Sequence, residues 1–292
     1  MNRNLAIFTD NLSKIYNKNN NEVEALINFS ISIEKGSIYG LLGPNGAGKS
    51  TFINIIAGLV KKNKGIVNIS GLDLDKNPIQ IRKKIGVVPQ ELNIDPFFTP
   101  YELLELQAGL YGVNKKDRRT IEILQKMQLF DKKNAYARNL SGGMRRRLLI
   151  AKALVHDPEI IFLDEPTAGV DVELRMNLWT YIKSLCNQGK TICLTTHYLE
   201  EAEKLCDYIA IINNGKKILE DKKENLLNLF SNRIVEFEIQ SEIVKLPNIL
   251  KKYLIKHNNN KLTLEYDKKE INLSAIIRAL NDNNFLFSEL KT

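Results

Sequence analysis

One short segment constrains the fold of this chain more than any other. Residues 43–51 read Gly-Pro-Asn-Gly-Ala-Gly-Lys-Ser-Thr and fit the phosphate-binding loop pattern G-x-x-x-x-G-K-[ST]. The apolar run 38–42 before the loop predicts a short buried strand, and residues 52–59 after it predict a helix. Because the motif requires that strand–loop–helix context, the pattern favours a phosphate-binding α/β fold over an ordinary glycine-rich turn.

The residue types of the loop suit a nucleotide. Glycines let the backbone approach phosphate oxygens where a Cβ would clash. The N–H groups of the loop and of the following helix N-terminus favour an anion. Lys49 is expected to reach the β- and γ-phosphates, and the Ser50 hydroxyl is expected to ligate Mg²⁺. The predicted nucleotide-binding residues of this loop are Gly43, Pro44, Asn45, Gly46, Ala47, Gly48, Lys49, Ser50 and Thr51.

A second apolar run, residues 160–163, ends in two carboxylates, Asp164 and Glu165. Continuous apolar side chains predict a strand buried on both faces, as a parallel sheet requires. At the end of such a strand Asp164 could hold Mg²⁺, and Glu165 could accept a proton from, or orient, an attacking water molecule. The alternative, two carboxylates that only cap a turn, is disfavoured by the phosphate loop upstream.

Three other side chains are candidates for the same site. Gln90 follows the short apolar strand 85–88 and could ligate Mg²⁺ or position a water molecule, although a glutamine there is usually a surface residue. His197 follows the strand 191–196, at the sheet edge where open α/β folds bind ligands, which favours a catalytic over a structural histidine. Tyr16 could stack on adenine. Taken alone, a half-buried strand tyrosine is the favoured interpretation of Tyr16.

A helical block interrupts the α/β pattern between about residues 91 and 157. Ser141 is a natural N-cap for the last of its helices. Gly142 and Gly143 then expose backbone N–H groups that could bind an anion, although a lone signal of this kind could be only a cap. Apolar residues at helical spacing predict helices over residues 101–111, 117–129 and 142–155.

Length and composition set broad limits. With 292 residues the chain can form two domains, and 43% apolar with 26% charged residues is ordinary for a globular protein. No apolar run reaches about 18 residues and no signal-peptide pattern opens the chain, so we expect neither a transmembrane helix nor secretion. The three cysteines, Cys186, Cys193 and Cys206, are odd in number and lack metal-binding spacing, which suggests a reducing cytoplasm.

The net charge of +8 is spread over clusters such as Lys61-Lys62 and Arg145-Arg146-Arg147. Such clusters can favour anionic lipid or nucleic acid. Solvated faces are the better interpretation, and no nucleic-acid-binding motif accompanies them, so no nucleic-acid partner is expected.

The chain is expected to divide into residues 1–230 and 231–292. Alternation predicts strands at 6–8 and 30–33 in the first part, and a hairpin through Asn213-Asn214-Gly215 near its end. The second part predicts the order βαββαβ, a small α+β domain that resembles a ferredoxin-like unit. A regulatory or dimer-supporting role and a merely solubilising one are equally compatible with its sequence.

Taken together, the motifs resemble those of the ATP-binding-cassette ATPases over residues 5 to about 225. The resemblance implies the P-loop NTPase fold of that family, with an inserted helical subdomain at about 91–157. It makes Tyr16 the aromatic A-loop residue, Gln90 the Q-loop glutamine and His197 the switch histidine. The signature motif is Leu140, Ser141, Gly142, Gly143 and Met144, and the D-loop at 168–171 ends in Asp171.

Three longer segments resemble those of the ABC-2-type exporter ATPases of bacteria. One surrounds the signature motif, and the other two are residues 164–171 and 195–203. The YadG-like group is nearest, with the daunorubicin-resistance and Nod-factor exporter ATPases as relatives. Met144 replaces the glutamine of many family members, and the D-loop differs from the commonest sequence. Both departures look usual in this subgroup and do not indicate inactivation.

The resemblance implies that two chains bind ATP and Mg²⁺ head to tail, each ATP lying between the phosphate loop of one chain and Ser141, Gly142 and Gly143 of the other. The second chain would be either another copy of this chain, in a homodimer, or a different ATPase chain. The resemblance also implies a separate ABC-2-type membrane permease, contacted by residues 91–101 and the helical block, that holds the chain at the inner face of the membrane. A soluble ATP switch without a permease and a non-hydrolysing nucleotide-binding partner are the competing interpretations.

Overall fold

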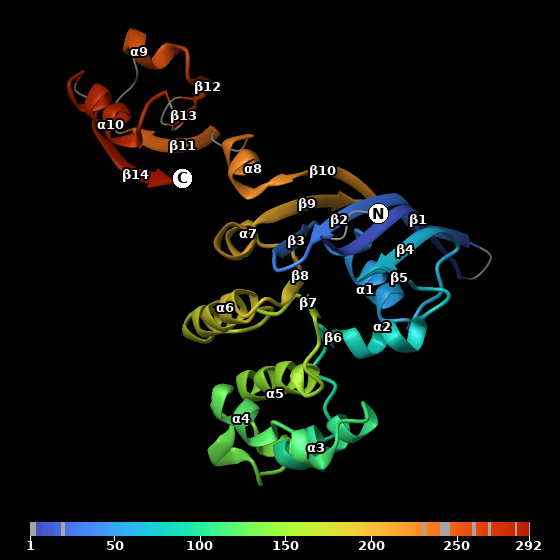
Figure 1. Cartoon of the computed structure of the whole chain (residues 1–292). Helices are drawn as coiled ribbons and strands as arrows, with labels where there is room; N and C mark the ends of the chain where they lie inside the picture. The colour runs from blue at the N-terminus through green and yellow to red at the C-terminus, as the bar shows by residue number, and fades with distance from the viewer. Residues whose placement is uncertain are drawn as a thin grey trace. The chain divides into compact units, whose positions relative to one another are not determined.

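The computed structural model describes residues 4–18, 21–229, 232–239, 246–258, 261–267, 270–283 and 285–291. The chain forms two compact units, Met1–Lys223 and Glu224–Thr292. The helix α8 (Lys223–Leu229) begins at the boundary between them. The elements of both units are labelled in Figure 1.

A six-stranded sheet organises the first unit, in the order β10-β9-β3-β8-β7-β6. All neighbours in it pair in parallel except β9 and β10, which form the expected hairpin. The central strands β7 and β8 are buried along their whole length, which explains the apolar run 160–163 in β7 and the apolar centre 192–194 of β8. The six strands are β3 (Ile38–Leu42), β6 (Ile85–Val88), β7 (Ile160–Asp164), β8 (Thr191–Thr196), β9 (Tyr208–Asn213) and β10 (Lys216–Lys222).

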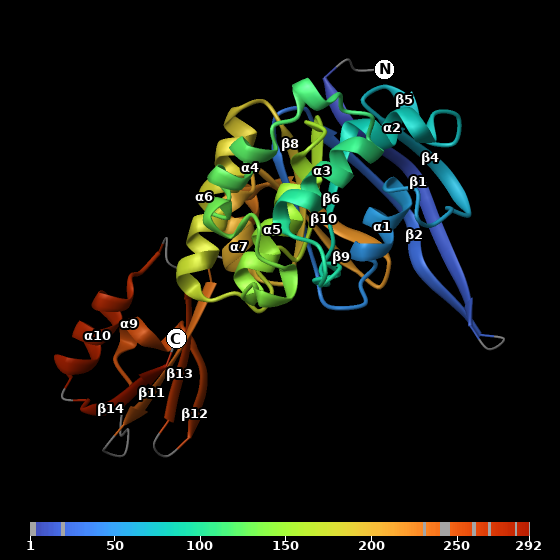
Figure 2. The ribbon, with the colours of Figure 1, turned by 90° about the horizontal axis from the view of Figure 1, so that it is seen from below.

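A second, antiparallel sheet has the order β2-β1-β4-β5. Its strands β1 and β2 are 14 residues long each and run side by side in Figure 2, whereas alternation predicts only residues 6–8 and 30–33. Irregular pairing explains the difference, because register shifts and positive φ angles at Asn11 (50°) and Asn28 (47°) break the two-residue period. The four strands are β1 (Leu5–Lys18), β2 (Asn21–Glu34), β4 (Lys64–Ile69) and β5 (Leu72–Asp73).

The helix α1 (Lys49–Ile56) joins the cores of the two sheets. Its buried Phe52 lies 5.5 Å from the ring of Phe29 in β2 and 6.5 Å from that of Phe162 in β7, measured between ring centroids. Aromatic contacts of this kind add to the free energy gained by apolar burial. The segment after the phosphate loop is therefore held on both sides by packed side chains.

The predicted helical block is present, and two of its three helices lie within one residue of the expected bounds. The helix expected over 117–129 spans only Thr120–Lys126, because single 3₁₀ turns flank it and Gln128 has a left-handed φ of 54° that ends it. A capping box of Thr99 and Glu102 starts α3. The helices of the first unit are α2 (Pro78–Lys84), α3 (Pro100–Leu110), α4 (Thr120–Lys126), α5 (Gly142–Leu154), α6 (Val172–Asn187) and α7 (Leu199–Leu205). Among the described residues, no helix combines the length and the hydropathy needed to cross a bilayer.

The second unit follows the order β11, α9, β12, β13, α10, β14. Its sheet has the order β12-β13-β11-β14 with antiparallel neighbours, the arrangement of a split βαβ unit. Phe285 packs into the core of this unit shortly before the last strand, β14, begins at Phe287. The elements are β11 (Asn232–Ile239), α9 (Asn248–Lys251), β12 (Leu254–Asn258), β13 (Lys261–Asp267), α10 (Leu273–Asn281) and β14 (Phe287–Lys291).

Candidate functional site

The phosphate loop leaves the sheet at the end of β3 and enters α1 at Lys49. The N–H of Gly43 donates to the carbonyl of Thr196 at 3.1 Å, which anchors the loop to the end of β8. The N–H of Gly215, in the β9–β10 turn, donates to the carbonyl of Ala47 at 2.9 Å. The loop is thus hydrogen-bonded to two neighbouring segments.

Two glycines of the loop are required by close backbone neighbours. A Cβ at Gly43 would lie 2.2 Å from the carbonyl oxygen of Ile212, and one at Gly48 would lie 2.4 Å from that of Ala25. Gly46 differs, since it has a φ of 79° and a Cβ there would meet nothing within 4 Å. The first two glycines let the loop pack against the protein, and the third leaves open space at the loop surface.

Lys49 is buried, at 5% exposure, and is held by the loop itself. Its Nζ donates to the carbonyl oxygens of Gly43 at 2.7 Å and Pro44 at 3.1 Å. The same Nζ lies 3.3 Å from Oε1 of Glu165. A buried ammonium so close to the loop provides a fixed positive charge for phosphate oxygens.

The two carboxylates predicted at the end of β7 face different partners. Asp164 accepts a 2.5 Å hydrogen bond at Oδ1 from the Thr195 hydroxyl, and that hydroxyl accepts the N–H of Glu165 at 3.0 Å. Glu165 has a left-handed φ of 46°, uncommon for a residue with a side chain. Backbone strain of this kind persists only where surrounding contacts hold it, as at active sites.

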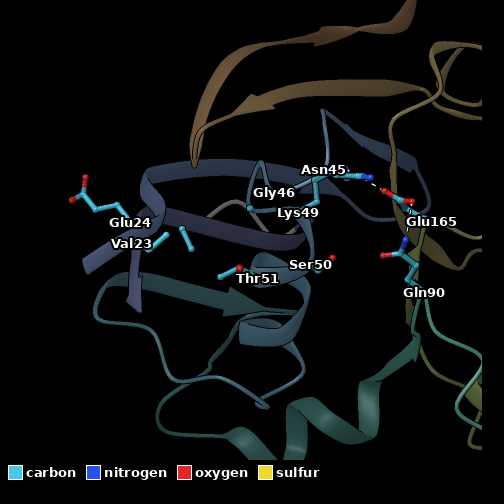
Figure 3. Close-up of a pocket in the computed structure, with 11 residues that line it drawn as sticks. Val23, Glu24, Asn45, Gly46, Lys49, Ser50, Thr51, Gln90 and Glu165 are labelled. Carbon is cyan, nitrogen blue, oxygen red and sulfur yellow. Dashed lines mark hydrogen bonds and ion pairs between the residues drawn. The ribbon is translucent and has the colours of Figure 1, made fainter. Parts of the chain in front are cut away.

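Three predicted site residues converge on the carboxylate of Glu165, and Figure 3 shows two of them, Lys49 and Gln90. Lys49 lies at its Oε1, as does Nδ1 of His197 at 3.2 Å. The Nε2 of Gln90 donates to its Oε2 at 3.1 Å. Glu165 is only 5% exposed. Side chains that follow β3, β6 and β8 therefore meet on one carboxylate after β7, at the carboxyl edge of the sheet, where open α/β folds bind ligands.

A cavity of about 400 Å³ lies over the loop and opens beside Glu165. Sequence analysis did not identify its wall from β2, formed by Val23, Glu24 and Ala25, because the register of the β1–β2 pair cannot be predicted from the sequence. Tyr16 pairs with Val23 across that register but does not line the cavity. In Figure 3 the carboxylate of Glu24 points away from Lys49. The lining residues are Val23, Glu24, Ala25, Asn45, Gly46, Gly48, Lys49, Ser50, Thr51, Gln90 and Glu165.

The structure does not bring the residues of the signature motif to this cavity. Ser141 caps α5 by accepting the N–H of Met144 at 3.2 Å, and Gly142 is exposed at the same helix start. Gly143 packs on Leu174, since a Cβ there would lie 2.2 Å from its Cδ2. Asp171 caps α6 through a 2.9 Å bond from the N–H of Leu174. These residues lie at two helix starts that are in contact through Gly143 and Leu174, and none of them lines the cavity over the phosphate loop of their own chain.

The oxygen donors at the cavity suit Mg²⁺ bound together with a nucleotide. Ser50 lines the cavity, and Asp164, which is not one of its lining residues, directly precedes the lining residue Glu165. The amide of Gln90 donates through nitrogen to Glu165, which turns its oxygen away from that carboxylate. Among the described residues, no group of three or more His, Cys, Asp or Glu side chains could hold a metal ion. Mg²⁺ sites typically have only one or two protein ligands, and phosphate oxygens of the substrate complete the coordination.

Residues 26–168 match the family model described as "ABC transporter". The chain is 42% identical over 200 residues to a Nod factor export ATP-binding protein I of Cupriavidus pinatubonensis, a match covering 68% of this chain and 62% of that protein. It is 39% identical over 225 residues to the protein of the same name in Rhizobium etli, covering 76% and 70%.

Two solved structures share the fold. One, described as the dimeric structure of a post-hydrolysis state of an ATP-binding cassette bound to ADP and Pi, is 30% identical with a TM-score of 0.67 and covers 74% of this chain and 98% of its own. The other, an ATP binding subunit of an ABC transporter, is 27% identical with a TM-score of 0.69, covering 77% and 93%.

Proposed function

Because this chain belongs to the ATP-binding cassettes of the ABC transporter family, we propose that it binds and hydrolyses ATP as the energy-supplying subunit of a bacterial ABC-2-type export system. The observation that carries the proposal is the convergence of Lys49, Gln90 and His197 on the carboxylate of Glu165. Four separate sequence motifs contribute these four side chains.

The geometry supports a division of labour at the reacting phosphate. Lys49 and the loop N–H groups bind the phosphates, and Ser50 and Asp164 would hold Mg²⁺, which neutralises charge on the phosphate oxygens. Gln90 and His197 orient the carboxylate of Glu165 from two sides. That carboxylate then accepts the proton of the attacking water molecule.

A second chain completes the site in this proposal. Ser141 and Gly142 lie at a helix start that is free to meet an anion supplied by another copy, and they do not reach the cavity of their own chain. Val172 and Met176, next to Asp171 at the start of α6, are 72% and 54% exposed. Exposed apolar side chains beside these two helix starts suit an interface between two chains.

A groove between α2 and the end of α3 supports a permease contact. Its volume is about 300 Å³. Ile79 and Leu110 are 66% and 74% exposed in it, beside Arg82 and Lys83. A groove lined by exposed apolar and basic side chains suits a cytoplasmic permease segment that carries apolar and acidic side chains. This groove adds α2 to the surface expected at residues 91–101 and the helical block.

Coexpression with candidate ABC-2-type permeases tests the exporter proposal. The chain should sediment with membranes when its permease is present and stay in solution without it. Leu110→Glu should abolish the sedimentation and leave the ATPase activity of the free chain unchanged, because Leu110 is exposed at the end of α3 and does not line the cavity beside Glu165. Ile218→Glu, at another 62% exposed apolar residue, is the matched control and should sediment normally. A chain that stays in solution beside every candidate permease would favour the soluble-switch alternative.

A further inference from the structure

Arg146 is the most deeply buried arginine near the candidate site. It lies in the second turn of α5, the helix that Ser141 caps, and is only 3% exposed. Arginine is almost never buried to this degree unless its charge is paired. A specific set of partners is therefore expected around its guanidinium.

Its two terminal nitrogens bond to the backbone on either side of the site. Nη1 donates to the carbonyl of Pro89 at 2.8 Å, one residue before Gln90. Nη2 donates a longer bond, 3.5 Å, to the carbonyl of Glu165. The planar guanidinium suits two acceptors at a fixed angle, which an ammonium cannot match. One side chain thus links α5 to the backbone of both Pro89 and Glu165.

The electrostatic surroundings favour a charged guanidinium at this place. Burial lowers the pKa of Arg146, and nearby carboxylates oppose that shift. These carboxylates belong to Asp164, Glu165 and Glu201. Arg146 therefore places a positive charge among three acidic side chains without lining the cavity itself.

We propose that Arg146 is a positioning residue for ATP hydrolysis, which holds the backbone of Glu165 and Pro89 so that the Gln90–Glu165 contact keeps its geometry. The left-handed φ of 46° at Glu165 needs such support, because strained backbone relaxes when its contacts are lost. Since Arg146 starts from the helix that carries Ser141, it also ties the signature motif to the hydrolytic carboxylate. This inference rests on the proposed function, in which Glu165 accepts the proton.

The next residue, Arg147, offers a matched control. It is an arginine of the same helix, but its Nη1 donates to the carbonyl of Met127 at 2.9 Å and to the side chain of Gln128 at 3.0 Å. Both partners lie in the helical block. Replacing Arg147 therefore removes comparable hydrogen bonds without touching Gln90 or Glu165.

The experiment compares the steady-state ATPase of the full chain with Arg146→Met, Arg146→Lys and Arg147→Met, and measures binding of a fluorescent ATP analogue. Arg146→Met should lower kcat by about 10- to 100-fold, because a displacement of about 1 Å in a catalytic group costs as much as 10²-fold. Its KM and analogue affinity should stay within about twofold of the parent chain. Arg146→Lys keeps the charge but cannot donate to the carbonyls of Pro89 and Glu165 in the same geometry, so its kcat should be intermediate. The kcat of Arg147→Met should remain near the parent value.

The proposal would be overturned if Arg146→Lys and Arg146→Met both kept the kcat of the parent chain. It would also be overturned if Arg146→Met and Arg147→Met lost kcat to the same extent. A loss of analogue affinity that matches the loss of kcat would show a general structural role and overturn it as well. If Arg146→Met does not fold, the kcat of Arg146→Lys is compared with that of Arg147→Met. A kcat of Arg146→Lys equal to that of the parent chain then contradicts the proposal. A parent chain that itself fails to hydrolyse ATP would instead contradict the proposed function.

Discussion

At the scale of single residues, the site depends on backbone that only glycine can supply. Gly48 has a φ of 109° and sits where a Cβ would clash with the carbonyl of Ala25. Two separate penalties therefore meet at this residue, a left-handed backbone and a close neighbour in β2. Because that neighbour is backbone, it cannot move aside as a flexible side chain would.

Gly48→Ala should lower the free energy of unfolding by more than the roughly 1–3 kcal/mol of backbone strain alone, because the loop must also shift away from β2. Gly189→Ala is the control, since Gly189 has a φ of 89° and a Cβ there would meet nothing within 4 Å, so this variant has strain without a clash. Urea unfolding, followed by the fluorescence of the single tryptophan Trp179, measures both. Equal losses in the two variants would contradict the steric account of Gly48.

At the scale of elements, parallel and antiparallel strands differed in how well sequence analysis predicted them. Strands of the six-stranded sheet such as β6 and β7 are short buried runs, and their apolar continuity predicts them. The long ribbon of β1 and β2 was predicted only in part, because its bulges interrupt the alternation. The resemblance to cassette ATPases is confirmed by the family match and the similar proteins.

The sequence indicates which side chains gather at one edge of the sheet when they follow strands of that sheet, and it does not indicate the neighbours that depend on strand register. Lys49, Gln90, Glu165 and His197 follow strands of one sheet, so the shared carboxyl edge brings them together. Val23 reaches the cavity through strand pairing that no local pattern encodes. The roles expected for the signature motif and for Asp171 need a second chain, and they stay predictions.

The loop after α5 contains a histidine whose titration should weaken the fold. The ring of His156 stacks on Tyr111, at the end of α3, with centroids 3.7 Å apart, and its Nε2 lies 2.9 Å from the carbonyl of Ile85 in β6. Burial lowers the pKa of His156 below its ordinary 6.5. The hydrogen bond to Ile85 and the charge of Asp157 oppose that shift with smaller effects, and the charge of Lys190 lowers the pKa further. The unfolded chain therefore binds a proton at a higher pH than the folded chain does.

The stability contributed by neutral His156 is present above about pH 6.5 and is lost as the pH falls from there toward the lowered pKa. His156→Phe keeps the ring stacking and removes the titrating group. Its free energy of unfolding should fall less between about pH 7.5 and about pH 5 than that of the parent chain, in urea titrations at both values. Equal pH dependence in the two proteins would show that His156 does not titrate differently on folding.

At the scale of the whole molecule, the first unit holds the phosphate loop and the signature motif at places that do not meet within one chain. ATP bound by one chain is therefore expected to bridge to Ser141 of another. Glu165→Gln keeps the shape of the side chain and removes its charge, so this variant should retain Mg-ATP and accumulate as a dimer in size-exclusion chromatography. Glu165→Gln with Ser141→Arg should stay monomeric with Mg-ATP, because the bulky arginine blocks the contact.

The rate of ATP hydrolysis by Glu165→Gln tests the central claim most directly, since three site residues contact this carboxylate. The phosphates and Mg²⁺ are assigned to Lys49, Ser50 and Asp164, so the variant should bind Mg-ATP as the parent chain does. Loss of a general base typically costs about 10²- to 10⁴-fold in rate, and we expect a fall in kcat within that range. Hydrolysis at the parent rate, with ATP bound, would contradict the assignment of Glu165 as the catalytic base.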